Sequence, residues 1–152
     1  MKIMVLYEVE NAFLFYDREY DMISFKWLGA VADEEYRTAV KIAYEKTVEL
    51  EVTRWLTDTR EGKVVSTEAQ KWMITDFIPN YISKSSLRRV AFLVSKDAFR
   101  QEYIDKVKRS FSDYQIEVFE DPKKAKLWLT RMYSKKEDIE NELRIKARQE
   151  NN

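Results

Sequence analysis

Polar residues that could hold a small ligand follow two apolar segments of this sequence. They are Asp58, Thr59 and Arg60, after segment 52–57, and Ser95 and Lys96, after the apolar run 90–94. If both segments are strands, these residues lie at strand ends, where open α/β sheets bind ligands when the strand order reverses. A carboxylate beside a guanidinium or ammonium group could hold a small polar molecule. The same residues also fit a solvated ion pair with turn-forming neighbours, which adds little stability.

Other kinds of chemistry are excluded by composition. The 152 residues contain no His and no Cys, which removes histidine-based triads, thiolates, disulfides and the usual zinc, haem and iron–sulfur ligands. The only glycines are Gly29 and Gly62, so neither a P-loop nor a GxGxxG turn can be formed. Nothing in the spacing of the acidic residues indicates a glycosidase pair or a calcium loop. We therefore expect no enzymatic activity, no cofactor and no metal.

The charge balance limits the class of partner. The 27 basic and 27 acidic residues cancel, which argues against nucleic acid and against an anionic membrane surface. Nucleic-acid binding would also need exposed aromatics between basic residues, whereas all four Trp residues fall in expected strands or on apolar helix stripes. No apolar run approaches the roughly 18 to 20 residues of a spanning helix, and Glu8 and Glu10 interrupt any signal-peptide core. We expect a cytoplasmic protein.

The first third of the chain predicts an antiparallel meander and a helix. Segments 4–9, 12–16 and 22–27 are rich in aromatic and β-branched residues and are separated by polar turns. Alternation in the third segment predicts a wet face that carries Met22, Ser24 and Lys26. An amphipathic stripe from Tyr36 to Thr47 then predicts a helix with Asp33 as its N-cap.

The rest of the domain alternates between strands and helices. Segment 52–57 reads as a strand that ends in a turn at 61–63, and Ser66 or Thr67 opens a second helix that Pro79 ends or kinks. The run 90–94 is continuously apolar, which predicts a central strand covered on both faces. The remaining predicted elements are a helix 99–111 capped by Asp97, a strand 116–119, and a helix opened by Asp121-Pro122 that buries Ala125, Trp128, Leu129 and Met132.

The predicted fold is therefore α/β, in the order βββαβαβαβα, with a mixed sheet and helices packed on it. Residues 1–133 form the domain. Residues 134–152 are strongly charged and read as a helical or frayed tail outside the core. Ile139 and Leu143 in this tail could seed a dimer or dock on the body, or the tail could be a solvated helix. The oligomeric state stays open.

Short motifs along the chain match the pattern of a known family. They are Phe25-Lys26-Trp27-Leu28-Gly29, Glu35-Tyr36-Arg37, Trp55-Leu56-Thr57-Asp58-Thr59-Arg60, Trp72, Pro79, Arg89-Val90-Ala91 and Ala125-Lys126-Leu127-Trp128-Leu129. With the element order, they resemble the STAS family of bacterial anti-sigma-factor antagonists. The closer resemblance is to the divergent SpoIIAA-like group, which shares its fold with CRAL-TRIO lipid-binding domains. It covers about residues 10 to 130.

The resemblance implies a candidate phosphorylation site. In the STAS family, a partner kinase phosphorylates a serine at the start of the helix after the Asp-bearing strand, and this switches partner binding. The matching positions here are Ser66 and Thr67, although Val65 and Glu68 stand near the places of the family's acidic residue and glycine. A helix N-terminus favours a phosphate. Either hydroxyl could equally serve only as a helix cap.

Two functions follow as hypotheses. The first is a non-enzymatic, STAS-like regulatory module that binds a partner protein through the surface around the second helix. The second, implied by the CRAL-TRIO relationship, is a domain that encloses a lipid or another small hydrophobic ligand.

Overall fold

The computed structural model describes residues 2–95, 98–110 and 115–150. Its strands are β1 (Ile3–Val9), β2 (Ala12–Asp17), β3 (Met22–Gly29), β4 (Arg54–Gly62), β5 (Arg89–Leu93) and β6 (Gln115–Phe119). Its helices are α1 (Asp33–Leu50), α2 (Thr67–Trp72), α3 (Ile78–Asn80), α4 (Ala98–Ser110), α5 (Pro122–Thr130) and α6 (Lys135–Glu150). A π turn (Met73–Phe77) joins α2 to α3, and a 3-10 turn (Ile82–Lys84) follows. The predicted order of strands and helices is confirmed.

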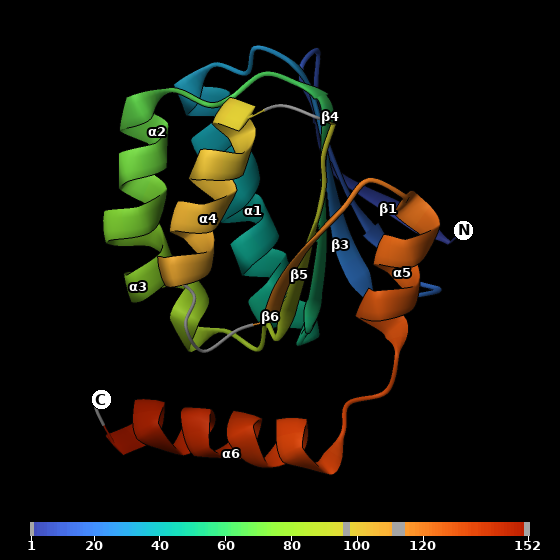
Figure 1. Cartoon of the computed structure of the whole chain (residues 1–152), viewed down its shortest axis with the longest axis vertical. Coiled ribbons are helices and arrows are strands. Elements are labelled where there is room, and N and C mark those ends of the chain that lie inside the picture. Colours follow the sequence, from blue (N-terminus) through green and yellow to red (C-terminus); the bar gives the residue numbers. More distant parts are fainter. Residues whose placement is uncertain (1, 96–97, 111–114, 151–152) are drawn as a thin grey trace.

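Within the described residues, the strands form one six-stranded sheet in the order β1-β2-β3-β4-β5-β6. The first three strands are antiparallel, and β3 to β6 are parallel. Because each parallel crossover steps in the same direction along the sheet, crossovers of one hand place α1, α2 and α4 on the same face, as Figure 1 shows. Helix α5 packs on the opposite face, against β4, β5 and β6.

Strand β5 lies inside the sheet between β4 and β6, and all five of its residues are buried. Val90 and Phe92 face the larger core under α1, α2 and α4, whereas Ala91 and Leu93 face a smaller core under α5. This confirms the strand covered on both faces that the apolar run predicts.

Three local predictions are wrong. Met22 and Ser24 are buried, at 0% and 5% exposure, so their side of the sheet is not the solvent-exposed face that was predicted. Met22 packs in the core under α5. Met132 is 89% exposed, since α5 ends at Thr130 and does not bury it. The strand predicted at 52–57 extends to Gly62, because Glu61 and Gly62 pair with the end of β3 instead of forming a turn.

Helix boundaries follow the predicted caps in part. Asp121 accepts a hydrogen bond from the backbone N–H of Lys123 at 2.9 Å, as expected for the cap of α5. Asp33 is the first residue of α1, not its cap, and its carboxylate accepts a hydrogen bond from Ser66 instead. Pro79 lies in the last turn of this stretch, which passes through the π turn and ends at Asn80, close to the predicted end. Asp97, the predicted cap of α4, and Phe111 lie outside the described residues.

Candidate binding site

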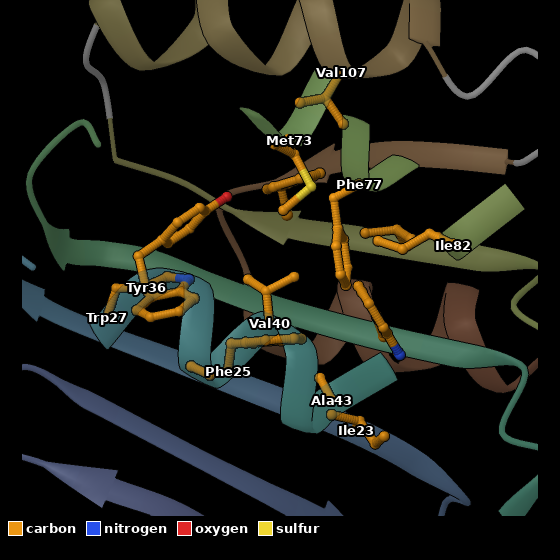
Figure 2. Packing of buried hydrophobic residues seen from close by; sticks show 14 of the residues in the cluster. Ile23, Phe25, Trp27, Tyr36, Val40, Ala43, Met73, Phe77, Ile82 and Val107 are labelled. Atoms are coloured by element: carbon orange, nitrogen blue, oxygen red, sulfur yellow. The ribbon is translucent and has the colours of Figure 1, made fainter. Parts of the chain in front are cut away.

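A largely apolar cavity of about 90 Å³ lies between the sheet and helices α1 and α4. Phe25, Trp27, Trp55, Val90 and Phe92 line it from the sheet. On the other side, the lining includes Tyr36, Val40, Met73, Ile104 and Val107. Figure 2 shows Tyr36 beside Trp27, with Met73 and Val107 across the core from the sheet residues. The predicted helix stripes and buried strand faces therefore surround this cavity.

The cavity opens near the carboxyl ends of β3 and β4. Val31, which follows β3, lines this part, as do Lys63, Val64 and Val65, which follow β4. The Lys63 side chain is exposed, so its ammonium group stands in water beside an apolar opening. No helix among the described residues is both long enough and apolar enough to span a bilayer.

Two tyrosine hydroxyls form a buried polar pair at the cavity. Tyr36 on α1 and Tyr103 on α4 have their Oη atoms 3.0 Å apart, and each can be the donor. Burial raises the pKa of Tyr103 to about 12 and raises the pKa of Tyr36 well above its usual value. Both phenols are therefore neutral at physiological pH. They can exchange hydrogen bonds with a ligand but cannot act there as charged groups.

The structure divides the predicted Asp58, Thr59 and Arg60 group. Arg60 donates two hydrogen bonds to the Asp58 carboxylate, at 3.0 and 2.8 Å. Burial alone would raise the pKa of Asp58, but the hydrogen bonds from Arg60 outweigh burial and lower it. Thr59 points to the other face of β4, as strand alternation requires. There it lines the cavity and donates to the carbonyl of Leu93 at 2.7 Å.

Asp58 and Arg60 form an ion pair toward the end of β4 and do not line a ligand-binding crevice. The sheet order runs from β1 to β6 without reversal, so the topological condition for a switch-point crevice is not met. Ser95 is exposed after the end of β5. Lys96 lies outside the described residues.

Ser66, not Thr67, caps the second helix. The Ser66 hydroxyl accepts the backbone N–H of Ala69 at 3.0 Å and donates to the Asp33 carboxylate at 2.7 Å. Thr67 is the exposed first residue of α2. Thr67 and Gln70 have the spacing of a capping box, but Gln70 donates to the carbonyl of Val65 instead, so no capping box forms. A phosphate on Ser66 would stand next to the carboxylate of Asp33, which opposes it electrostatically.

The sequence reasoning missed Lys63 and the tyrosine pair. Tyr36 and Tyr103 each fell on a predicted apolar stripe, but their hydroxyls form a hydrogen bond between residues that are 67 positions apart in the sequence. No local pattern encodes that distance. Alternation along β4 could have separated Thr57 and Thr59, which line the cavity, from Asp58 and Arg60.

The fold is that of a SpoIIAA-like domain. The SpoIIAA-like family model matches residues 22–130, and the chain belongs to this family. A solved structure with the same fold is that of an uncharacterised protein from Shewanella loihica PV-4, which belongs to the DUF3478 family and has a SpoIIAA-like fold. It is 22% identical to this chain, has a TM-score of 0.54, and the alignment covers 84% of this chain and 91% of that one. No curated protein matches the chain. The resemblance derived from the sequence is thus confirmed at the level of family and fold.

Proposed function

We propose that this chain is a non-enzymatic binding domain for a small molecule with a short apolar end and a polar or anionic end. The observation that carries the proposal is the apolar cavity between the sheet and the helices, open beside Lys63. Ligand sites are typically concave and mostly apolar, with a few polar groups that fix the ligand's orientation. The apolar end would enter the cavity, and the polar end would stay near the Lys63 ammonium group.

The size of the cavity limits the ligand. Its volume is about 90 Å³, whereas an apolar cavity of roughly 150 Å³ admits benzene. A short aliphatic group fits this space, and a complete lipid chain does not. The domain would therefore hold the end of a chain or a small branched group, with the rest of the ligand outside.

The polar groups at the cavity favour binding over catalysis. Tyr36 and Tyr103 stay neutral because burial raises both pKa values, and a general base should have a pKa near the working pH. The Tyr pair and Thr57 offer hydrogen bonds, and Lys63 offers a positive charge. These groups can select and orient a ligand.

The test uses hexanoate, with hexanol as its neutral counterpart, and follows the melting temperature and Trp fluorescence of the full chain. Hexanoate should raise the melting temperature in a saturable way. Val107→Phe, which fills the cavity from α4, should abolish the effect of both compounds, while Val48→Phe, at a half-exposed site on α1, should leave it unchanged. Lys63→Gln should weaken hexanoate but not hexanol. Unchanged binding by a folded Val107→Phe variant would contradict the proposal, as would the absence of any response to either compound.

A partner protein at the surface around α2 is the second candidate function, in line with the resemblance to anti-sigma-factor antagonists. The exposure of Thr67 at the start of α2 favours it. Because Ser66 is held by Asp33 and Ala69, a phosphorylation switch would act at Thr67. Intact-mass analysis of protein from its native host should then show one added phosphate that Thr67→Ala abolishes and Ser66→Ala does not. Pull-downs with Thr67→Ala and Glu68→Ala, both at exposed positions of α2, should lose the partner. Unchanged partners in both variants would remove this surface.

A further inference from the structure

Helix α6 extends beneath the domain and is tied to it near its first turn (Figure 1). Glu137 binds the buried guanidinium of Arg89 with an N–O distance of 2.8 Å, and Asp138 pairs with Arg88 at 3.2 Å. The side of α6 that carries Glu137, Glu140, Asn141 and Arg144 borders a small crevice with Arg88 and Tyr133. This side is therefore turned toward the body of the protein.

Another side of α6 is exposed along its whole length and forms one straight stripe. Its members are spaced by three or four residues, so they stand one above another on the helix. Ile139 and Leu143, at its centre, are 58% and 62% exposed. The full stripe is Lys136, Ile139, Leu143, Ala147 and Glu150, all of them exposed. A stripe of this spacing is the kind that packs against another helix.

The charges of α6 fit a second, antiparallel copy of the same helix. Acidic residues concentrate in its first half and basic residues in its second half. If two copies cross antiparallel at Leu143, each position pairs with its mirror position on the partner. Lys136 then meets Glu150, and Ile139 meets Ala147. A parallel pairing would instead place equal charges opposite each other, which is unfavourable.

We propose that α6 is a self-association surface and that its partner is the α6 helix of a second copy of this chain, in antiparallel orientation. Such a contact is isologous, because each copy offers the same surface, and it closes into a twofold dimer. The 16 residues of α6 span only about 24 Å. An interface this small falls near or below about 1,200 Å² of buried surface, the range of weak and transient complexes. The dimer is therefore expected to dissociate on dilution and to weaken with added salt.

The first test is sedimentation velocity of the full chain from about 5 to about 300 μM, the range in which a weak interface changes occupancy. The wild-type protein should shift from monomer to dimer. Leu143→Glu places two like charges at the twofold axis and should raise the dissociation constant by at least about tenfold, equal to about 1.4 kcal/mol. Leu127→Glu is the matched control, because Leu127 is 71% exposed on α5 and lies outside the stripe. Circular dichroism verifies that each variant keeps its helices.

A charge exchange tests the pairing itself. Lys136→Glu alone and Glu150→Lys alone should each lose the dimer, because each creates two repelling pairs across the axis. An equimolar mixture of the two variants should recover it, because all four residues are then matched. The orientation can be read from cross-linking, since the chain has no cysteine. Mixed Ile139→Cys and Ala147→Cys chains should form a disulfide with each other much faster than either forms with itself.

Several outcomes would overturn the proposal. A wild-type chain that stays monomeric over the whole concentration range would do so. So would association that survives Leu143→Glu or is lost with Leu127→Glu, since the contact would then lie elsewhere. Failure of the mixed charge variants to recover the dimer would exclude the antiparallel pairing. All of these readouts are independent of ligand binding at the cavity.

Discussion

Replacing Glu137 with glutamine isolates the ion pair that holds the start of α6. The carboxylate of Glu137 is 13% exposed and lies 2.8 Å from the guanidinium of Arg89, which is fully buried. Arg89 also donates to Gln115 and to the carbonyls of Trp128 and Arg131. Glutamine keeps the shape of the side chain and an acceptor oxygen while removing the charge, so the variant measures the electrostatic part of this contact.

The magnitude follows from the pKa of Glu137. The hydrogen bond from Arg89, with smaller contributions from Ser134, lowers the pKa from 4.5 to about 2 against a smaller opposing effect of burial. Each pKa unit is worth about 1.4 kcal/mol, so the carboxylate contributes at most about 3 kcal/mol to the free energy of unfolding at pH 7. Since the amide still accepts one hydrogen bond, we expect Glu137→Gln to cost about 2 kcal/mol.

The pH dependence gives the sharper test. Because the pKa is lower in the folded state, the stabilisation is complete above the unfolded-state value and is lost as the pH falls toward the folded-state value. Linkage reduces the contribution of about 3 kcal/mol at pH 7 to about 1.4 kcal/mol at pH 3. Urea unfolding of both proteins, followed by Trp fluorescence at low micromolar concentration, should therefore give curves that converge between pH 5 and pH 3. Glu142→Gln, on the same helix, is the control. Equal stabilities at pH 7, or a difference that does not change with pH, would refute the reasoning.

Three further substitutions test the packing around the cavity and the caps. Thr47→Val should cost about 1 to 3 kcal/mol in chemical denaturation, because the buried Nε1–H of Trp55 donates to the Thr47 hydroxyl at 2.8 Å and would lose its acceptor. Gly62→Ala should lower stability by about 1 to 3 kcal/mol, since its methyl group would stand 3.0 Å from Cβ of Trp27; a neutral result would mean that β3 can shift. Asp121→Ala should cost about 1 kcal/mol through loss of the α5 cap, and a calorimetric melt unchanged by it would show that Pro122 alone fixes the helix start.

The sequence pattern predicted the elements whose burial is visible within a single segment. The five buried residues of β5 and the apolar stripe of α1 follow directly from composition and period. The burial of Met22 and Ser24 could not be predicted this way, because the sequence of β3 alternates as in a strand with one buried face and one exposed face. Met22 is covered by α5, which lies a hundred residues further along the chain. Tertiary contacts overrode the alternation.

The candidate site was predicted less well, for a similar physical reason. The residue types at 58–60 suggested a polar ligand, but strand alternation turns Asp58 and Arg60 away from the cavity and pairs them with each other. The cavity is formed where Tyr36, Tyr103 and the end of β4 come together. Each of these segments reads alone as ordinary core or turn. A binding surface of this kind exists only after the helices have packed on the sheet.

Strand β5 connects the two surfaces proposed here, which determines how they should be tested. Val90 and Phe92 line the cavity, and the residue just before them, Arg89, holds the end of α5 and the start of α6. Replacing Arg89 would leave a buried site unfilled and would remove the hydrogen bonds that it donates to Gln115 and to the carbonyls of Trp128 and Arg131. A change at Arg89 would disturb β5, the cavity wall and α6 together, so its effects could not be assigned to either function. Glu137 and Leu143 lie on α6 and away from the cavity lining. Substitutions there can alter self-association or helix docking while leaving the ligand site intact, and Val107→Phe does the reverse. If the cavity and the exposed stripe of α6 are separate surfaces, each set of variants should change only its own readout, ligand binding or self-association.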